Sequence, residues 1–354
     1  MESRRLFEVV LRGRKITLGR RTLVMGVLNV TPDSFSDGGL YLDSGAAIAH
    51  GLEMARQGAD WIDVGGESTR PGAKPVPAEE ELRRVLPVIR GLHRRAPSLP
   101  ISIDTTKADV AERAVEAGAS IINDVSGLRF DASLADVARR EGTPLVLMHL
   151  RGKPETMQQR PFPQFIMRSV GRGLAWSIRR ALGHGVSRSQ LVIDPGLGFG
   201  KTRRQNFEIL AGLHRLRRLG VPLMVGSSRK SFVQALAAGE GLDPHRVAHT
   251  SRSRKRGSLG PLKKAGKGRG FSPAAQAPSN QIIENIGARF SAGLKAPPFS
   301  GVQPPLALQI GDAAMMVAAI LGGAHIVRVH DVAAMLPAVR IADALLEAGY
   351  IGKP

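Results

Sequence analysis

The sequence predicts a (β/α)₈ barrel, the fold class called the TIM barrel. Short apolar runs alternate with amphipathic helical patterns along almost the whole chain, and this alternation is typical of parallel strands joined by helices. Eight such runs are present, which is enough to close the sheet on itself. An open doubly wound sheet is the alternative. However, no Gly-x-Gly-x-x-Gly turn follows the first strand.

The predicted elements follow one another with few gaps. Residues 6–18 are expected to form a hairpin that turns at Arg12 and Gly13. The strands are expected at 24–28, 61–64, 101–104, 121–122, 145–149, 191–194, 223–226 and 326–329. The helices are expected at 44–57, 78–95, 108–117, 133–140, 165–182, 205–219, 312–321 and 334–348.

Local signals justify these boundaries. Ser44 is a suitable N-cap for the first helix, and residues 78–95 begin with an acidic turn, which complements the positive end of a helix dipole. Loops rich in Gly, Pro, Asn and Asp, such as VTPDSFSDGG and GGESTRPG, follow the strands. The periodic segments are therefore strands and helices, and the segments between them are turns.

Composition points to a cytoplasmic protein. The 354 residues are 43% hydrophobic, which suffices for one large core. The chain has no Cys, so it has neither a disulfide framework nor thiol chemistry. Its basic N-terminus lacks the apolar run of a signal peptide, and no stretch is apolar for long enough to span a membrane.

The net charge of +20 would ordinarily favour a nucleic-acid or acidic partner. Residues 251–311 hold ten Lys or Arg and one acid, Glu284, and are rich in Gly, Pro and Ser. We expect a disordered basic insertion at 251–311 and a single barrel domain made of residues 1–250 and 312–354. Weak contact of the insertion with nucleic acid or another polyanion, a coding artefact, and a loop that gates the active site are the alternatives.

Polar residues recur where the predicted strands end. They are Asn29, Asp104, Asn123, Asp194, Lys230, Arg328 and His330. In a barrel these ends converge on one mouth, where active sites lie. Asp194 follows the apolar run Leu191–Val192–Ile193 and precedes a Pro- and Gly-rich turn. It is either one half of a structural ion pair or the acceptor for a ligand with two adjacent N–H donors.

Six motifs, in order, resemble those of the dihydropteroate synthases, the pterin-binding TIM-barrel family of folate biosynthesis. The motifs are GVLNVTPDSFSDGG from Gly26, DVGGESTRPG from Asp63, SIDTTKADVAERAVEAGASIINDVSG from Ser102, LVIDPGLGFGKT from Leu191, GSSRKSF from Gly226 and IVRVHDV from Ile326. The resemblance implies a transferase that condenses 6-hydroxymethyl-7,8-dihydropterin pyrophosphate with p-aminobenzoate. The products are 7,8-dihydropteroate and pyrophosphate. It further implies a need for Mg²⁺, a homodimer formed through the last helices, and a sulfonamide target.

The resemblance also assigns roles to residues of this chain. Asp194 accepts from the amino edge of the pterin, and Asp104, Asn123 and Lys230 complete its surroundings beside Met148. Arg328 and His330 face the departing pyrophosphate, with a structural pairing to Asp331 as the alternative for both. Asn29 meets the Mg²⁺ ion.

Two loops complete the implied site for p-aminobenzoate. Asp33 and Phe35 lie on the first loop, and Thr69, Arg70 and Pro71 lie on the second, with Phe199 and Ser231 on the far side. The implied catalytic residues are Asp33, Phe35, Thr69, Arg70, Lys230, Arg328 and His330. The implied reaction is dissociative and needs no covalent nucleophile, and closure of the loops excludes water from the pterin cation. His149 also ends a strand, and a direct role for it is the less favoured alternative.

Two other functions remain open at this point. A corrinoid-linked pterin methyltransferase shares the barrel and the pterin carboxylates, but the DSFSDGG, STRPG and VHD motifs argue against it. A catalytically silent paralogue would bind pterin, or RNA through the insertion, without turnover. Release of pyrophosphate distinguishes the synthase from both.

Overall fold

The computed structural model describes most of the chain, and all of the described residues fall in one compact unit formed by residues 1–243 and 301–354. The described residues are 4–11, 13–31, 44–69, 72–153, 155–157, 163–226, 228, 230–242 and 305–349. The predicted site residues Asp33, Phe35, Arg70 and Pro71, and most of the predicted insertion, lie outside them.

The sheet confirms the predicted barrel. Eight parallel strands pair in the order β8-β7-β6-β5-β4-β3-β10-β9. The parallel bridge between Ile193 and Leu223 joins the two ends of this order, and the Ile193 N–H donates to the carbonyl oxygen of Pro222 at 3.0 Å. The strands are β3 (Leu23–Asn29), β4 (Trp61–Gly65), β5 (Ile101–Asp104), β6 (Ile121–Asp124), β7 (Leu145–Met148), β8 (Leu191–Asp194), β9 (Met224–Gly226) and β10 (Ile326–Val329).

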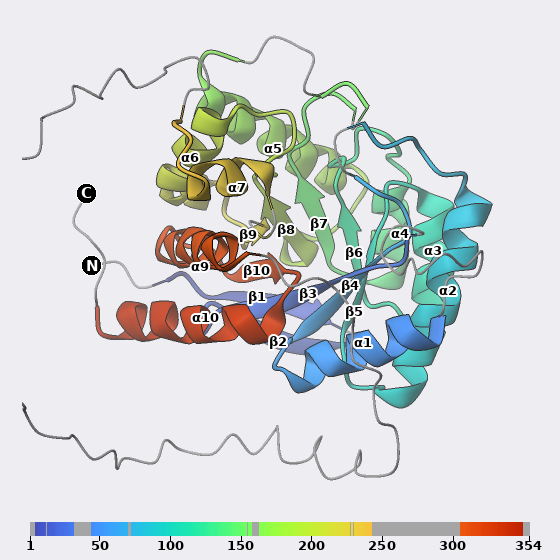
Figure 1. Cartoon of the computed structure of the whole chain (residues 1–354). Coiled ribbons are helices and arrows are strands. Elements are labelled where there is room, and N and C mark those ends of the chain that lie inside the picture. Colours follow the sequence, from blue (N-terminus) through green and yellow to red (C-terminus); the bar gives the residue numbers. More distant parts are fainter. Residues whose placement is uncertain are drawn as a thin grey trace, which may run out of the picture. The chain divides into compact units, whose positions relative to one another are not determined.

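Helices surround the strands (Figure 1). They are α1 (Ser44–Arg56), α2 (Ala78–Arg95), α3 (Ala108–Glu116), α4 (Leu134–Glu141), α5 (Ile166–Gly183), α6 (Arg203–Ala211), α7 (Ser231–Ala237), α9 (Leu306–Leu321) and α10 (Val332–Glu347). A strand at the centre needs apolar residues on both faces, one toward the barrel interior and one toward a helix. The continuous apolar runs of the sequence meet this need.

Three helix predictions need correction. The single helix predicted for 205–219 is α6 followed by a 3-10 helix, Leu213–Leu219, with Gly212 between them. The helix predicted from 312 begins at Leu306, so residues 306–311 belong to α9 and not to the insertion. Short α7 after β9 was not predicted. The other six predicted helices begin and end within two residues of the predicted positions.

The predicted hairpin is confirmed and closes one end of the barrel. Strands β1 (Phe7–Leu11) and β2 (Arg14–Leu18) pair antiparallel, and Gly13 turns with a φ of 72°. The hairpin side chains pack on the interior side chains of the barrel strands in one cluster. That cluster contains Val9, Leu11, Leu18, Met25, Trp61, Ile121, Val146, Val192, Met224 and Ile326. The hairpin therefore keeps water out of the barrel at the end opposite the strand carboxyl ends.

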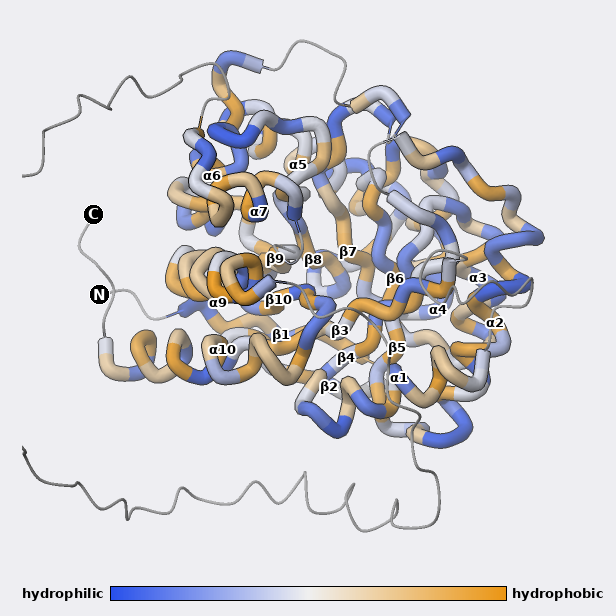
Figure 2. The backbone as a smooth tube through the Cα atoms, in the orientation of Figure 1, coloured by the Kyte–Doolittle hydropathy of each residue, from blue (hydrophilic) through white to orange (hydrophobic). Residues whose placement is uncertain are grey.

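The main core lies between the strands and the helices. Helix α2 shows how it is built: Val85, Val88, Ile89 and Leu92 recur at helical spacing and are fully buried. Removing one such side chain, as in Leu92→Ala, would cost about 2 to 5 kcal/mol. Figure 2 shows α9 as hydrophobic over most of its length, in keeping with its sequence LALQIGDAAMMVAAIL. Within the described residues, no helix has the length and apolar character needed to cross a membrane.

Candidate functional site

A pocket opens where the carboxyl ends of the strands meet. It encloses about 320 Å³, including space open to solvent. Its lining comes from loops and strand ends far apart in the sequence: Thr69, Asn123, Val125, Met148, Asp194, Gly196, Leu197, Phe199, Gly226, Lys230 and Arg328. Seven of these residues were among those predicted from the sequence, and the barrel brings them together.

A buried ionic cluster holds one wall of this pocket. The Arg328 side chain, from β10, places Nε 2.6 Å from Oδ2 of Asp63 and Nη2 2.7 Å from Oδ2 of Asp104. Asn123 donates its Nδ2 to the same Asp63 oxygen at 2.9 Å. We call Arg328, Asp63, Asp104 and Asn123 the inner cluster. Burial lowers the pKa of Arg328, but the two carboxylates outweigh it, so its pKa is raised and it stays charged.

The inner cluster keeps unused acceptors. Within the described residues, the buried oxygens Asp63 Oδ1, Asp104 Oδ1 and Asn123 Oδ1 have no hydrogen-bond partner. Burial raises the pKa of Asp104, although Arg328 opposes the shift. Buried acceptors without partners are rare in folded proteins because each carries a desolvation cost. Their gathering beside a pocket is what a ligand with several N–H donors would need.

Asp194 lies at the end of β8 and is 4% exposed. Its Oδ1 accepts from the N–H of Gly196 at 2.7 Å, and among the described residues no cation is within ion-pair distance. Burial raises its pKa to about 6, against the opposing effects of the Gly196 hydrogen bond and Lys230. Of the two interpretations left open by the sequence, the geometry favours an acceptor for a ligand over a structural ion pair.

Lys230 faces the same pocket from the start of α7. Its Nζ lies 4.4 Å from the centre of the Phe199 ring, a distance typical of a cation–π contact. Burial lowers its pKa to about 8, helped by Arg328 and opposed by Asp194. The pocket lining thus includes a carboxylate, an ammonium group and the aromatic ring that the ammonium group contacts.

The loop after β8 is fixed by a second lysine that the sequence analysis did not select. Lys201 is 3% exposed, and its Nζ donates to the carbonyl oxygens of His149, Gly196 and Phe199 at 3.0, 2.7 and 2.9 Å. Gly196 has a φ of +65°, and a Cβ there would lie 2.3 Å from the His149 carbonyl oxygen. Only glycine permits this approach, so the loop is seated directly on the segment after β7.

Other residues considered from the sequence do not line the pocket: Asn29, Asp104, His149, Ser231 and His330. Asn29 ends β3, with its Oδ1 near Gly65, and the His330 N–H donates to the Ser228 hydroxyl at 3.4 Å. Ser231 is exposed at the first position of α7 and does not line the pocket. His149 is buried against α5, where a Cβ on Gly173 would lie 2.5 Å from its ring, and it does not line the pocket.

The alternative that Arg328 and His330 pair with Asp331 is wrong for Arg328. Asp331 caps α10, and its side chain accepts from the Ala334 N–H at 3.0 Å. Arg328 binds Asp63 and Asp104 instead. Asp63 was not predicted from the sequence as a site residue. Its signal is a charged residue inside the buried run WIDVG, where an unpaired carboxylate would be very costly.

The closed barrel and the polar pocket at the carboxyl ends of its strands define a TIM-barrel enzyme. The model of the family described as "Pterin binding enzyme" matches residues 25–264. A dihydropteroate synthase from Synechocystis sp. is 38% identical, over 92% of this chain and 91% of its own length. The dihydropteroate synthase of Escherichia coli K12 is 36% identical, over 92% of both chains. The chain therefore belongs to the pterin-binding enzyme family, among the dihydropteroate synthases.

Solved structures agree with this assignment. The chain is similar to the dihydropteroate synthase of Xanthomonas albilineans with 4-aminobenzoic acid, with a TM-score of 0.70, 37% identity and coverage of 96% of this chain and 98% of the other. The same enzyme in complex with 7,8-dihydropteroate gives a TM-score of 0.67 at 35% identity, with the same coverage. The Yersinia pestis enzyme with a sulfonamide drug complex gives 0.71 at 33%, covering 97% and 100%.

Proposed function

We propose that this chain condenses 6-hydroxymethyl-7,8-dihydropterin pyrophosphate with p-aminobenzoate to give 7,8-dihydropteroate and pyrophosphate. The observation that carries the proposal is the pocket lined by Asn123 and Asp194, with the open acceptor of Asp104 beside it on Arg328, in a chain whose relatives are dihydropteroate synthases. Relatives with bound 4-aminobenzoic acid, 7,8-dihydropteroate and sulfonamide support the same substrates, and a sulfonamide as inhibitor. The cysteine-free sequence supports a cytoplasmic location.

Pterin recognition follows from complementary hydrogen bonding. A pterin presents N–H and NH₂ donors on one edge, and Asp194 supplies a buried carboxylate for them. The open oxygens of Asp104 and Asn123 take further donors, and Lys230 faces the carbonyl side with its ammonium group. An analogue that lacks one donor would leave a buried acceptor unpaired, at a cost of about 1 to 3 kcal/mol. These buried acceptors would therefore give selectivity as well as affinity.

The reaction needs a good leaving group and a dry pocket. The bond between the hydroxymethyl carbon and the pyrophosphate oxygen breaks, and its electron pair leaves with pyrophosphate. The amino nitrogen of p-aminobenzoate then bonds to that carbon and loses a proton. Arg328 and His330 would stabilise the charge that develops on the leaving oxygen. Met148 and Phe199 provide apolar walls.

The aminobenzoate side of the proposal depends on the two loops. Thr69 is the described residue of the second loop that lines the pocket, and Asp33, Phe35 and Arg70 lie outside the described residues. Ser231 keeps its proposed place on the far side of this subsite, although it does not line the pocket in this structure. Loop closure would exclude water from the carbon that bears positive charge.

The residues present suit Mg²⁺. Within the described residues there is no group of three or more His, Cys, Asp or Glu that could hold a metal ion alone. Mg²⁺ prefers oxygen and keeps most of its waters, so one or two protein oxygens plus the pyrophosphate suffice. Asn29 Oδ1 and the Asp104 carboxyl group both flank Gly65, and Asn29 would hold the ion. When bound, Mg²⁺ would neutralise charge on the pyrophosphate.

The homodimer is proposed on the exposed apolar side chains of the last helices. Leu306 and Ile310 of α9 are 71% and 59% exposed, and Ile341 of α10 is 62% exposed. Burying such side chains against a second copy would be favourable, at about 25 cal/mol per Å² of apolar surface. Light scattering on the full chain should give twice the monomer mass, and Ile310→Glu should give the monomer. A monomeric unmodified chain would contradict this.

The test of the function is formation of dihydropteroate by the purified full chain with both substrates and Mg²⁺, measured together with pyrophosphate release. Product in a one-to-one ratio with pyrophosphate is expected. Pterin binding without turnover would establish the silent paralogue instead. Methyl transfer without pyrophosphate release would establish the methyltransferase, which the relatives do not favour.

A further inference from the structure

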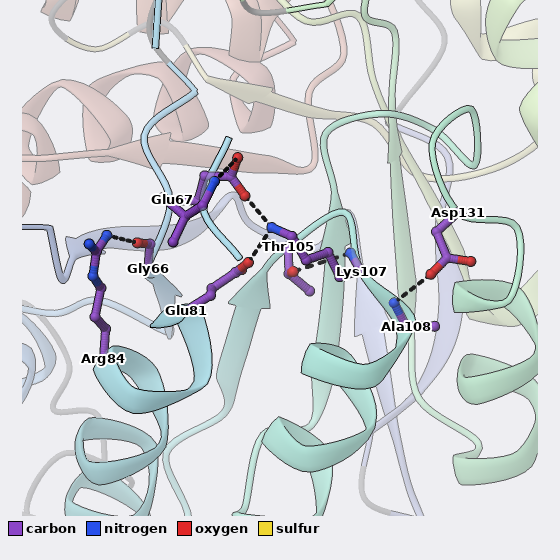
Figure 3. A network of polar contacts seen from close by, with 9 residues as sticks. Gly66, Glu67, Glu81, Arg84, Thr105, Lys107, Ala108 and Asp131 are labelled. Atoms are coloured by element: carbon purple, nitrogen blue, oxygen red, sulfur yellow. Dashed lines mark hydrogen bonds and ion pairs between the residues drawn. The ribbon is translucent and has the colours of Figure 1, made fainter. Parts of the chain in front are cut away.

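A second ionic cluster lies between the loops that follow β4 and β5 and the first turn of α2 (Figure 3). The Nζ of Lys107 lies between the carboxylates of Glu67 and Glu81. It contacts Glu67 Oε2 and donates to Glu81 Oε2 at 2.6 Å. We call Lys107, Glu67 and Glu81 the outer cluster. None of the three residues lines the pocket, and the proposed reaction does not use them.

Glu67 fastens the loop that carries Thr69. It is the second residue after β4, and its other oxygen, Oε1, accepts from the N–H of Val76 at 3.3 Å. One carboxylate thus holds the start of the loop to its return toward α2, and it is itself held by Lys107. Thr69, two residues later, lines the pocket.

The residue before Glu67 is fixed as well. The carbonyl oxygen of Gly66 accepts from Arg84 Nη1 at 2.8 Å, and Arg84 Nε donates to Glu80 at 2.9 Å. A Cβ on Gly66 would lie 2.8 Å from Val85 Cγ1, so the backbone rests directly on α2. The start of the loop is therefore docked on the helix layer, and Lys107 connects this docked segment to the neighbouring β5–α3 loop.

The environment makes this connection strong. The Glu81 side chain is fully buried, and the side chains of Lys107 and Glu67 are 25% and 20% exposed. Burial lowers the pKa of Lys107, but its two carboxylates outweigh burial and raise it. The ammonium group therefore stays charged at neutral pH, and its removal would leave two carboxylates facing each other without a cation.

We propose that Lys107 is a positioning residue for the aminobenzoate half of the site, acting through Glu67 on the loop that carries Thr69. This inference rests on the function proposed above. The pterin half is held independently, since Arg328 fixes Asp104 from inside the barrel. Loss of Lys107 should therefore act on one substrate far more than on the other, which a general loss of structure would not do.

The experiment compares Lys107→Met and Glu67→Gln with Lys107→Arg. In the first two variants the KM for p-aminobenzoate should rise about tenfold, while the KM for the pterin pyrophosphate stays within about threefold. Lys107→Arg keeps a cation and should recover most of the change. Lys15→Met is the matched control. It removes the same charge at the other end of the barrel, where the Lys15 side chain is exposed and pairs with Glu8 of the hairpin. It should match the unmodified enzyme.

Hydrogen exchange supplies a readout that needs no turnover. Amides of residues 66–76 should exchange faster in Lys107→Met and Glu67→Gln than in the unmodified chain or in Lys15→Met. An equal rise of both KM values, or unchanged exchange in this segment, would overturn the proposal. If the unmodified chain makes no dihydropteroate, the proposed function fails, whereas faster exchange confined to residues 66–76 would still show that Lys107 holds the loop. If Lys107→Met does not fold, the Glu67→Gln variant decides.

Discussion

The inner and the outer cluster have the same arrangement of charges and different roles. Each places one cation between two carboxylates, Arg328 between Asp63 and Asp104, and Lys107 between Glu67 and Glu81. Strands β4 and β5 contribute Asp63 and Asp104 to the inner cluster, and the loops after them contribute Glu67 and Lys107 to the outer cluster. The same composition therefore does not determine the role.

The two clusters differ in the hydrogen-bond partners of the side-chain oxygens that do not bind the cation. Within the described residues, three buried oxygens of the inner cluster have no hydrogen-bond partner, and two members of this cluster, Asn123 and Arg328, line the pocket. The outer cluster has one such oxygen, Glu81 Oε1, and none of its members lines the pocket. The second carboxylate oxygen of Glu67, Oε1, accepts a hydrogen bond from the Val76 N–H of the same loop. An ionic cluster with acceptors left open at a cavity suits a ligand, and one closed on backbone groups suits a loop.

The largest effect is expected for Arg328→Met. The variant leaves Asp63 and Asp104 buried side by side without a cation, and breaking a buried pair in this way costs about 3 to 5 kcal/mol of stability. Synthesis should fall at least about a hundredfold, because fixed positive charge at the leaving group is lost as well. Urea unfolding and pyrophosphate release measure the two effects. Arg328→Lys, which keeps the charge without the two-pronged geometry, should recover part of the stability. A stable, active Arg328→Met enzyme would remove the inner cluster from the mechanism.

The next effect is expected for Asp194→Asn. The amide can turn its oxygen to the Gly196 N–H, which places donor hydrogens where the pterin presents its own. Binding of a pterin analogue should weaken by about 3 kcal/mol, roughly a hundredfold or more. Isothermal calorimetry measures the affinity. Since the fold does not need this charge, the melting temperature should not fall, and unchanged affinity would contradict the assignment of Asp194.

The pH dependence of pterin binding follows from the same residue. Burial raises the pKa of Asp194 to about 6 in the free protein, and the pterin donors favour the ionised form. Affinity should therefore be constant just above pH 6 and should fall, by up to about tenfold per unit, as the pH drops below it. Asp194→Asn should lack this fall. A slope that persists in the variant would assign the titration to another group.

A smaller effect is expected for Glu81→Gln in the outer cluster. Glu67 remains to balance Lys107, and the buried charge whose pKa burial raises is removed. The free energy of unfolding should change by about 1 kcal/mol or less, because the lost attraction and the relieved desolvation offset each other. Urea unfolding at pH 7 tests this. A loss as large as that of Arg328→Met would show that the two clusters are equally important for stability.

The smallest effect is expected for removal of the basic segment. Both clusters and the pocket are formed by residues outside 251–304. Gly311 of α9 packs against Val233 of α7, so a linker of about eight residues should rejoin the helices at little entropic cost. Synthesis should be retained, and binding to a polyanion such as heparin should weaken. Loss of turnover in a folded, shortened chain would make the segment part of the site or of the dimer.

The sequence by itself determined the fold and the positions of most pocket residues. Strand runs and helical spacing are local patterns, and closing eight parallel strands leaves their polar end residues at one mouth. Asn123, Asp194, Lys230 and Arg328 could therefore be placed together before any coordinates. The family motifs supplied the ligand, which the pattern of residues alone left open.

Tertiary structure decided the partnerships. Arg328 and Asp63 are 265 residues apart, and Lys107 and Glu67 are 40 apart. No local periodicity relates such pairs. The direction of the side chain and the elements that pack next to it determine the partner of a carboxylate. This partner can be a guanidinium, a backbone N–H or a ligand in the pocket. The early start of α9 at Leu306 places Gly311 within this helix, where it packs against Val233 of α7, 78 residues away in the sequence.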